Sequence, residues 1–360
     1  MKISILTNGP GELWDWVRPV SVELRKRGHS ISLWLLSCPY ASGSERQVAS
    51  GLGVDKLEGP LDGIHMWNAL GQEKTDCVLQ LGGDLIFGRH LAKRAAAPLF
   101  CYAYAPKKGM EHARCFTAWP KMALQMPKAR VIGDLVRDAL ALDTGTLSWG
   151  QRESRRLLLF PGSRPAIRQM ALPWMALLAG QVKLALPDVE IGTLFSPFVH
   201  DEELPLWREA GLNPIQIGAG VAMRSADYAL TQPGTNTLEM MHCGLPALIA
   251  APDQFLEAVP LGGLRGMLAS LPLMGSAIRR RGLERLLDRY EGFMSWPNRL
   301  AGRMVMDEMK GDLSPQKLAD RVVSALKDEG RRARAREELL ALSGPAGAAF
   351  RLAEAMEAAV

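Results

Sequence analysis

Short apolar runs alternate along the chain with glycine-containing turns and longer amphipathic segments. Such runs, rich in Val, Ile and Leu, are typical of strands buried in a parallel sheet, and the longer segments are typical of the helices that cover it. In the first half the pattern predicts strands at residues 2–7, 30–36, 76–81, 99–104 and 130–132. In the second half it predicts strands at 156–160, 190–195, 215–217, 228–231 and 247–251. We therefore expect an α/β protein of two Rossmann-like domains that face each other across a cleft.

A break in this pattern indicates where the domains meet. Residues 143–150 (DTGTLSWG) are small or polar and show no periodicity, as in a linker. We expect an N-terminal domain at residues 1–142, a C-terminal domain at 151–330 and a helical tail at 331–360. Amphipathic helices are expected at 314–326 and 330–359, and the tail could pack on the N-terminal domain or on a second subunit of a homodimer.

Composition narrows the class of protein. Of the 360 residues, 48% are hydrophobic and 22% are charged, as in a soluble globular protein. Lys and Arg total 43 against 38 acidic residues. This mild excess fits an anionic small molecule or an anionic membrane surface, and it falls short of a nucleic-acid-binding protein. There is no apolar run of about 20 residues and no signal peptide, so we expect a cytoplasmic protein without a membrane span.

Neither cysteines nor histidines form a metal-binding pattern. The five cysteines are scattered without a C-x-x-C spacing, which favours buried, reduced thiols, and the six histidines show no ligand spacing. We therefore expect neither a metal nor another cofactor.

The turn between the predicted strands at 228–231 and 247–251 has the features of a phosphate site. Gly234 lets backbone N–H groups approach an anion, and a helix is expected to open at the next two residues. Glu239 lies in the first turn of that helix, where its carboxylate could accept both hydroxyls of a ribose. The alternative is an ordinary capped helix, in which Glu239 only complements the helix dipole. The donors that the turn offers come from Thr235, Asn236 and Thr237.

A second turn of similar form follows the predicted strand at 156–160. It reads Pro161-Gly162-Ser163-Arg164 and leads into a helix from about Ala166, with Arg168 one turn in. Glycine, serine and arginine at a helix start are suited to an anion. An ordinary strand–helix connection with a surface arginine is the alternative.

The first strand of the chain also ends in a glycine-rich turn, Asn8-Gly9-Pro10-Gly11-Glu12. It lacks the G-x-G-x-x-G spacing, and no acidic residue ends the second strand, which argues against a dinucleotide site. The glycines would let a ligand or the facing domain come close. The helix expected at 13–27 carries Trp14 and Trp16, which either pack in the core or form an apolar wall for an acceptor.

Asp84 follows a buried strand and two glycines, at the sheet edge where catalytic groups collect. It could serve as a general base. It could equally be the N-cap of the helix expected at 85–96.

Residues 255–281 break the α/β pattern. They are apolar, rich in Gly and Pro, and end in three arginines. They could form an interfacial patch on a membrane, with arginines at lipid head groups, or a loop packed against the other domain.

Three motifs of the second half resemble the lipid-A-disaccharide synthase family of inverting glycosyltransferases, which have the two-domain GT-B fold. They lie in the family's order and spacing within residues 157–326. The motifs are LFPGSR (159–164), SADYALTQPGTNTLEMMHCGLP (225–246) and SWPNRLAGRMVMDE (295–308).

The resemblance implies a donor that is a UDP-glucosamine derivative. The backbone of Gly234, Thr235, Asn236 and Thr237, with Arg164, would hold its diphosphate, and Glu239 would hold its ribose. Asn298 and Arg303 would complete the donor pocket.

The first half departs further from the family. Asp84 corresponds to the family's catalytic aspartate, whereas a second aspartate of that motif is absent. The family's first turn is changed here to one containing Gly9, Gly11 and Glu12, which would lie on the acceptor side.

The activity implied is transfer of an acylated glucosamine unit to a lipid-linked glucosamine phosphate at the inner face of the cytoplasmic membrane, with peripheral membrane contact. The alternatives are a transferase with a soluble acceptor, an enzyme like UDP-GlcNAc 2-epimerase, and a UDP-sugar-binding protein without activity.

Overall fold

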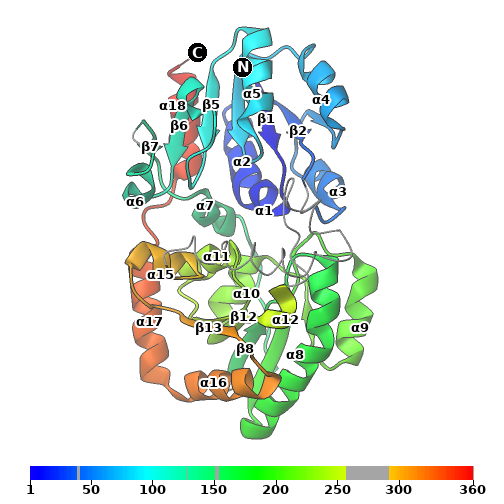
Figure 1. The fold of residues 1–360 in the computed structure, drawn as a ribbon, viewed down its shortest axis with the longest axis vertical. Helices are drawn as coiled ribbons and strands as arrows, with labels where there is room; N and C mark the ends of the chain where they lie inside the picture. The colour runs from blue at the N-terminus through cyan, green and yellow to red at the C-terminus, as the bar shows by residue number, and fades with distance from the viewer. Residues whose placement is uncertain (39–40, 127, 151–153, 257–291, 360) are drawn as a thin grey trace, which may run out of the picture. The chain divides into compact units, whose positions relative to one another are not determined.

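The computed structural model describes residues 1–38, 41–126, 128–150, 154–256 and 292–359. The chain divides into two compact units (Figure 1). The first unit comprises Met1–Leu142 and Gly344–Val360, and the second comprises Asp143–Ser343. The chain therefore passes from one unit to the other twice. No helix of the described residues is both long enough and apolar enough to cross a bilayer.

The first unit is built on a seven-stranded, fully parallel sheet of order β3-β2-β1-β4-β5-β6-β7. Its centre is buried on both faces, which is why the strands read as unbroken apolar runs. The strands β3 and β6 are short and contain charged residues, so the apolar pattern of the sequence did not predict them. The strands are β1 (Lys2–Thr7), β2 (Ser30–Leu35), β3 (Lys56–Glu58), β4 (Cys77–Leu81), β5 (Leu99–Tyr102), β6 (Arg114–Thr117) and β7 (Arg130–Val131).

The helix predicted at residues 13–27 is in fact three pieces. A short turn of α-helix leads into a π-helical turn over Leu13–Val17, in which the Arg18 N–H donates to the Leu13 carbonyl. Pro19 follows directly and has no N–H to continue an α-helical ladder, which accounts for the change of register. The helices of the unit are α1 (Pro10–Glu12), α2 (Arg18–Lys26), α3 (Glu45–Ser50), α4 (Gly63–Leu70), α5 (Leu85–Ala95), α6 (Pro120–Ala123), α7 (Leu135–Ala141) and α18 (Ala348–Glu357), with a 3₁₀ turn at Met110–His112.

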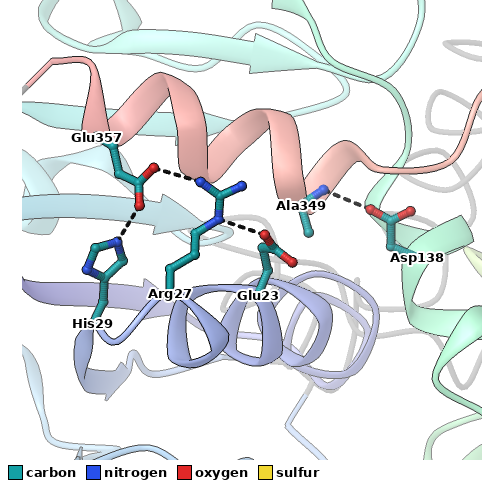
Figure 2. A network of polar contacts seen from close by, with 6 residues as sticks. All are labelled: Glu23, Arg27, His29, Asp138, Ala349 and Glu357. Carbon is teal, nitrogen blue, oxygen red and sulfur yellow. Dashed lines mark hydrogen bonds and ion pairs between the residues drawn. The ribbon is translucent and has the colours of Figure 1, made fainter.

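The chain returns to the first unit through α18, which packs on α2 and α7 (Figure 2). The Glu357 carboxylate accepts hydrogen bonds from Arg27 Nη1 (2.6 Å) and His29 Nε2 (2.8 Å). At the other end of the helix, Asp138 accepts from the N–H groups of Gly347 and Ala349 at 2.7 and 2.8 Å. Both ends of α18 are therefore fixed by charged side chains.

The second unit repeats the same plan with six parallel strands in the order β10-β9-β8-β11-β12-β13. The strands are β8 (Arg155–Leu159), β9 (Val189–Leu194), β10 (Pro214–Ile215), β11 (Tyr228–Thr231), β12 (Ala247–Pro252) and β13 (Asp307–Gly311). The helices are α8 (Pro165–Ala185), α9 (Leu204–Glu209), α10 (Ala219–Ser225), α11 (Asn236–Cys243), α12 (Asp253–Leu256), α15 (Trp296–Ala301), α16 (Pro315–Lys327) and α17 (Glu329–Leu342), with a 3₁₀ turn, η3, at Asp201–Glu203.

The sequence predicted one continuous tail helix at 330–359, and this prediction is wrong because the structure has two separate helices there. Gly344 and Gly347 adopt positive φ values of 67° and 88°, and Pro345 lies between them, so the chain turns between α17 and α18. The possible membrane patch at 255–281 lies outside the described residues from residue 257 onwards.

Both sheets have the Rossmann strand order, in which the first strand of the unit lies between the second and the fourth. The order reverses between β1 and β4 in the first unit and between β8 and β11 in the second. Ligands of open α/β sheets bind at the carboxyl ends of such strands. This topology places the turns after β1 and β4, and those after β8 and β11, side by side at the carboxyl edge of the sheet in each unit.

Candidate functional site

The turn after β8 is fixed from within the second unit by an ion pair whose arginine is buried. Arg168 is only 1% exposed and donates to both carboxylate oxygens of Glu203, at 2.8 and 2.6 Å. Its Nη1 also donates to the Ser163 carbonyl at 2.7 Å. Arg168 therefore shapes the turn instead of facing a ligand, which corrects its expected place in a phosphate cradle. Arg164, at the N-cap of α8, is the half-buried arginine of this turn.

Gln232 joins this turn to the one after β11. Gly162 has a φ of 97°, and a Cβ added there would lie 2.8 Å from Ile167 and about 3.5 Å from the Gln232 amide. A glycine is thus required by the backbone conformation and by the closeness of Ile167, and Gln232 of the other turn lies at ordinary contact distance. Gln232 Nε2 and Asn236 Oδ1 are buried and have no hydrogen-bond partner within the described residues. Buried polar atoms are nearly always paired in a complete protein, so these two atoms suit a polar ligand.

The helix predicted after this turn is confirmed. Thr235 is the N-cap of α11, and Gly244 ends the helix in the left-handed conformation (φ 64°). The first N–H groups of a helix have no partner within the helix, and together with the helix dipole they favour an anion. Thr237 has a structural task, since its hydroxyl donates to the Gly234 carbonyl (2.9 Å) and accepts from the Trp296 N–H (3.2 Å). Glu239 lies half-buried in the first turn, as expected.

The SWPN…MDE motif forms a closed network around Glu308. The Glu308 carboxylate accepts from the N–H groups of Met294 and Ser295, from the Ser295 hydroxyl and from Asn298 Nδ2. Asn298 also donates to the Met306 carbonyl, and its Oδ1 accepts from the N–H groups of residues 305 and 306. All four hydrogen-bonding positions of the Asn298 amide are therefore used inside the protein. This residue supports α15 beside the Thr237 turn and has no polar position left for a donor sugar.

Arg303, expected in the donor pocket, lies at the exposed end of α15. Its Nη1 pairs with Glu338 of α17 at 2.7 Å, and both side chains are exposed. Surface pairs of this kind contribute little to stability. The structure thus gathers Arg164, Gly234, Thr235, Asn236, Thr237 and Glu239 around two adjoining turns, and it gives Asn298 and Arg303 partners within the protein.

In the first unit, the turn after β1 lies against the turn after β4. A Cβ added to Gly82 would lie 2.9 Å from Glu12 Cγ and 3.0 Å from Asn8 Oδ1. The Glu12 side chain also folds back over Gly9, where an added Cβ would be 2.3 Å from its Oε2. Gly9, Gly11 and Glu12, which we expected on the acceptor side, therefore belong to the same sheet edge as Asp84.

Asp84 is exposed and caps α5, with its Oδ1 accepting from the Ile86 N–H at 3.1 Å. The capping alternative is thus observed. Because the same carboxylate is exposed, it can also contact a ligand. Two residues absent from the sequence-based site hold this turn: Gln80 Nε2 donates to the Gly82 carbonyl (2.6 Å) and Lys107 Nζ to the Gly83 carbonyl (3.2 Å). The signal for Gln80 is its amide in an otherwise apolar, fully buried strand.

An aromatic and carboxylate network lies at the same edge, beside the π-helical turn. Trp16 contacts Tyr102 and Tyr104 edge-on, with ring centroids 5.1 and 5.0 Å apart, and its Nε1 donates to the Tyr104 hydroxyl. Both tyrosine hydroxyls donate to buried Asp134. Burial, and then the Asp134 charge, raise the pKa of both tyrosines well above the usual value, so they stay neutral donors. Trp16 is therefore a core residue; Trp14, stacked on Arg18 at 3.9 Å, is half-exposed.

Within the described residues, no three His, Cys, Asp or Glu side chains are grouped so as to hold a metal ion. What the two edges offer a ligand is carboxylates and aromatic rings in the first unit, and a helix N-terminus, Arg164 and amide groups in the second.

Comparisons with known proteins agree with this architecture. No protein-family model matches the chain, and no curated protein matches it. The calicheamicin glycosyltransferase CalG4 is similar in structure, with a TM-score of 0.57 and 15% identity over 99% of this chain and 98% of that one. A putative UDP-N-acetylglucosamine 2-epimerase from Listeria monocytogenes has a TM-score of 0.63 and 11% identity, over 99% of this chain and 96% of that one. The structure of S. aureus MnaA with UDP has a TM-score of 0.57 and 14% identity, over 98% of this chain and 94% of that one. The fold is of the GT-B type.

This result confirms the predicted fold class. At these identities the likeness establishes the fold, and the chemistry has to be argued from the residues of the two edges.

Proposed function

We propose that this protein is an inverting glycosyltransferase related to lipid-A-disaccharide synthase. It would move an acylated glucosamine unit from a UDP-sugar to a lipid-linked glucosamine phosphate. The observation that carries the proposal is the pair of turns after β8 and β11, which carry Arg164, the α11 N-terminus and the unpaired amide atoms of Gln232 and Asn236. An anion with polar groups attached, such as a nucleoside diphosphate, fits that combination.

The chemistry would be a single displacement at the anomeric carbon. Asp84 takes the proton from the acceptor hydroxyl, and the hydroxyl oxygen attacks the anomeric carbon on the face opposite the diphosphate. The bond from that carbon to the diphosphate oxygen breaks, and the configuration inverts. The α11 N-terminus and Arg164 stabilise the negative charge on the departing UDP, while Glu239 accepts hydrogen bonds from its ribose hydroxyls. The mechanism uses no metal.

Two residues that were expected to bind the UDP-sugar have a different role in this proposal. Asn298 acts through α15, which it holds beside the Thr237 turn. Arg303 contributes a surface pair with Glu338 and does not touch the donor.

A UDP-GlcNAc 2-epimerase is the second candidate, because Glu12 lies against Gly82 and so brings another carboxylate to the turn of Asp84. Acidic groups on two sides of a sugar are what such an epimerase needs. Incubation with UDP-GlcNAc and no acceptor separates the two functions: release of an epimerised UDP-sugar supports the epimerase, and an unchanged UDP-sugar supports the transferase.

The first experiment is calorimetric titration of UDP, UDP-GlcNAc and UDP-2,3-diacylglucosamine into the wild type, Arg164→Ala and Arg208→Ala. Arg208 is an exposed arginine of α9 in the same unit and serves as the matched control. We expect preference for the acylated donor, lost in Arg164→Ala and kept in Arg208→Ala.

The other outcomes are equally informative. Equal affinity for UDP-GlcNAc would point to a transferase with a different acceptor. Tight UDP binding without turnover on lipid or soluble acceptors would indicate a binding protein. No binding of any nucleotide would refute the donor site.

A further inference from the structure

The outer face of α8 carries a repeating pattern of apolar residues that the proposed chemistry does not use. Exposed positions recur along it at alternating intervals of four and three residues: Ala166, Met170, Pro173, Leu177, Gly180 and Leu184. Leu177 is 63% exposed and Leu184 79%. This alternation is the heptad spacing of helices that pair along one seam. The opposite stripe of α8, which contains Ile167, Ala171 and Val182, is buried in the second unit, so the exposed stripe is a second apolar face.

The exposed face lacks the charges that a surface helix ordinarily carries. The charged residues of α8 are Arg168, which is buried, and Lys183. By contrast α16, which packs on α8, exposes Lys317, Asp320 and Lys327. Scattered exposed apolar residues are ordinary, whereas a continuous stripe about 27 Å long, at 1.5 Å per residue, marks an interaction surface.

The sizes of the side chains in this α8 stripe indicate which partner fits. Large residues alternate with small ones: Met170, Leu177 and Leu184 are large, and Ala166, Pro173 and Gly180 are small. No described atom lies within 4 Å of a Cβ added to Gly180, so there is room for a side chain from outside.

Two antiparallel copies of the α8 stripe complement each other. Residue 166 then faces 184 of the other copy, 170 faces 180, and 173 faces 177, so that every layer combines one large and one small side chain. A parallel pair would set like against like and leave a gap where two Gly180 residues meet. The stripe therefore fits a second copy of itself in one direction only.

The charges beside the stripe favour the same arrangement. Lys183 Nζ lies 3.5 Å from the Gly211 carbonyl at the end of α9, and the Arg168–Glu203 pair ties η3 to the start of α8. Lys183 and η3 thus lie on the side of α8 that faces α9 (Figure 1). The other two residues of η3 are acidic and exposed. A two-fold rotation keeps the α9 sides of both copies together, so Lys183 of each copy lies beside the acidic turn of the other.

We propose that the outer face of α8 is a homodimer interface, in which two copies of the chain pair antiparallel about a two-fold axis at the level of Met175. The interface does not involve α18, which packs on the first unit of its own chain. One helix pair is a small interface, so the dissociation constant should be on the order of 1–100 µM. The inference needs no nucleotide and no turnover, so its failure and the failure of the proposed function can be told apart.

The first test is sedimentation equilibrium of the full chain, of 39.4 kDa, at concentrations up to about 500 µM. We expect a monomer–dimer equilibrium for the wild type. Leu177→Asp should raise the dissociation constant by about 10²–10⁴-fold, because a buried leucine is lost from both copies. Leu124→Asp is the matched control: Leu124 is 81% exposed but lies at the end of α6 in the first unit, and the variant should dimerise like the wild type.

Gly180→Leu separates close packing from general apolar association. The change adds apolar surface and favours the helix, so general association should become stronger. In the antiparallel pair the new side chain meets Met170 of the other copy in a space that only glycine leaves open, so the dissociation constant should rise at least ten-fold. Stronger association of Gly180→Leu would overturn the proposal.

Cross-linking with a short bismaleimide tests the direction of the pair. Met170→Cys combined with Gly180→Cys should give a covalent dimer, because these positions face each other across the interface, and neither change alone should do so. The wild type is the control for the five native cysteines. A covalent dimer from Met170→Cys alone would indicate parallel helices and contradict the antiparallel pairing.

Circular dichroism and thermal melting of each variant establish that it is folded, as expected for substitutions at exposed positions. A folded wild type that stays monomeric over the whole concentration range would overturn the proposal. A dimer that is as tight in Leu177→Asp as in the wild type would overturn the assignment to this face.

Discussion

The carboxyl edges of the two sheets have the same strand order and opposite chemistry. In the first unit the turns after β1 and β4 present carboxylates, Glu12 and Asp84. In the second unit the corresponding turns present Arg164 and the N-terminus of α11. In the proposed function, one edge accepts a proton and the other holds an anion. On this proposal a common scaffold acquires two tasks through a few turn residues, which is why fold alone does not give function.

The two edges are also held together by different means. The turns of the first unit come close because Gly82 and Gly83 have no side chain, so added volume should disturb them most. The turn after β8 in the second unit is fixed by Arg168 and Glu203, so loss of a polar partner should disturb it most.

The largest expected effect separates the two tasks. Asp84→Asn keeps a capping oxygen for α5, so the fold should be retained, but it removes the base and should lower turnover by about 10²–10⁴-fold. Arg164→Ala should lower turnover by roughly 10²–10³-fold, as for loss of an oxyanion donor, and should also weaken UDP binding. Steady-state kinetics measures turnover and calorimetry measures UDP binding in both variants. Weakened UDP binding in Asp84→Asn alone would reverse the roles assigned to the two edges.

Arg168→Ala tests the polar support of the second unit. It leaves Glu203 without its partner and the Ser163 carbonyl without its donor, and we expect a loss of about 1–3 kcal/mol in the free energy of unfolding of this unit, because Glu203 is partly exposed to water. Urea unfolding measures the loss, with Arg208→Ala as a control expected to change it by no more than about 0.5 kcal/mol. The double change Arg168→Met/Glu203→Gln should recover part of the loss, because no carboxylate is then stranded. A double variant as unstable as the single one would contradict this explanation.

Gly82→Ala tests close packing in the first unit. The added methyl meets Glu12 and Asn8 within 3.0 Å at a φ of 104°, and we expect a loss of about 2–3 kcal/mol from strain and displacement together. Gly28→Ala is the matched control, since Gly28 also has a positive φ (78°) but nothing lies within 4 Å of an added Cβ. It should cost about 1 kcal/mol, from the backbone conformation alone. Equal losses in the two variants would mean that the approach of Glu12 to Gly82 is not tight.

The smallest effect concerns the attachment of α18. Hydrogen bonds from His29, and then from Arg27, lower the pKa of the Glu357 carboxyl below its ordinary value of 4.5. A lowered pKa means that the stabilisation is present above pH 4.5 and is lost as pH falls through the lower, folded-state value. Because the site is partly exposed, Glu357→Gln should cost at most about 1 kcal/mol at neutral pH. Thermal melts of both proteins should converge as the pH falls below 4.5; a difference that persists there would show that the carboxylate charge is not the cause.

The sequence predicted the strands well where burial makes a continuous apolar run. β1 and β11 were predicted to the residue, and most others to within one or two residues. β3, β6 and β13 were missed because they are short or charged, and their pairing depends on a neighbouring strand. The π-helical turn and the break between α17 and α18 were missed because both depend on backbone geometry at single prolines or glycines.

For the candidate site, sequence reasoning found the turns and could not assign every side chain within them. Gly234 and Asp84 are signalled by their place after a strand, so their positions follow from topology. From the sequence alone, Asn298 and Arg168 cannot be distinguished from ligand-binding residues. In the structure each forms its hydrogen bonds with other residues of the protein. Whether a polar side chain faces a ligand or supports a turn depends on partners far away in the sequence, such as Glu308 and Glu203.

The return of α18 to the first unit also has a consequence for synthesis on the ribosome. The faces of α2 and α7 are translated long before Leu352, Ala353 and Met356, the buried side chains of the helix that covers them. All of residues 143–343 must be made in between, which takes roughly 10–40 s at typical bacterial and eukaryotic elongation rates. During that time the nascent first unit displays an apolar groove, while the second unit, contiguous in sequence, can fold as soon as it emerges. Chaperones that bind nascent chains should therefore act mainly on the first unit.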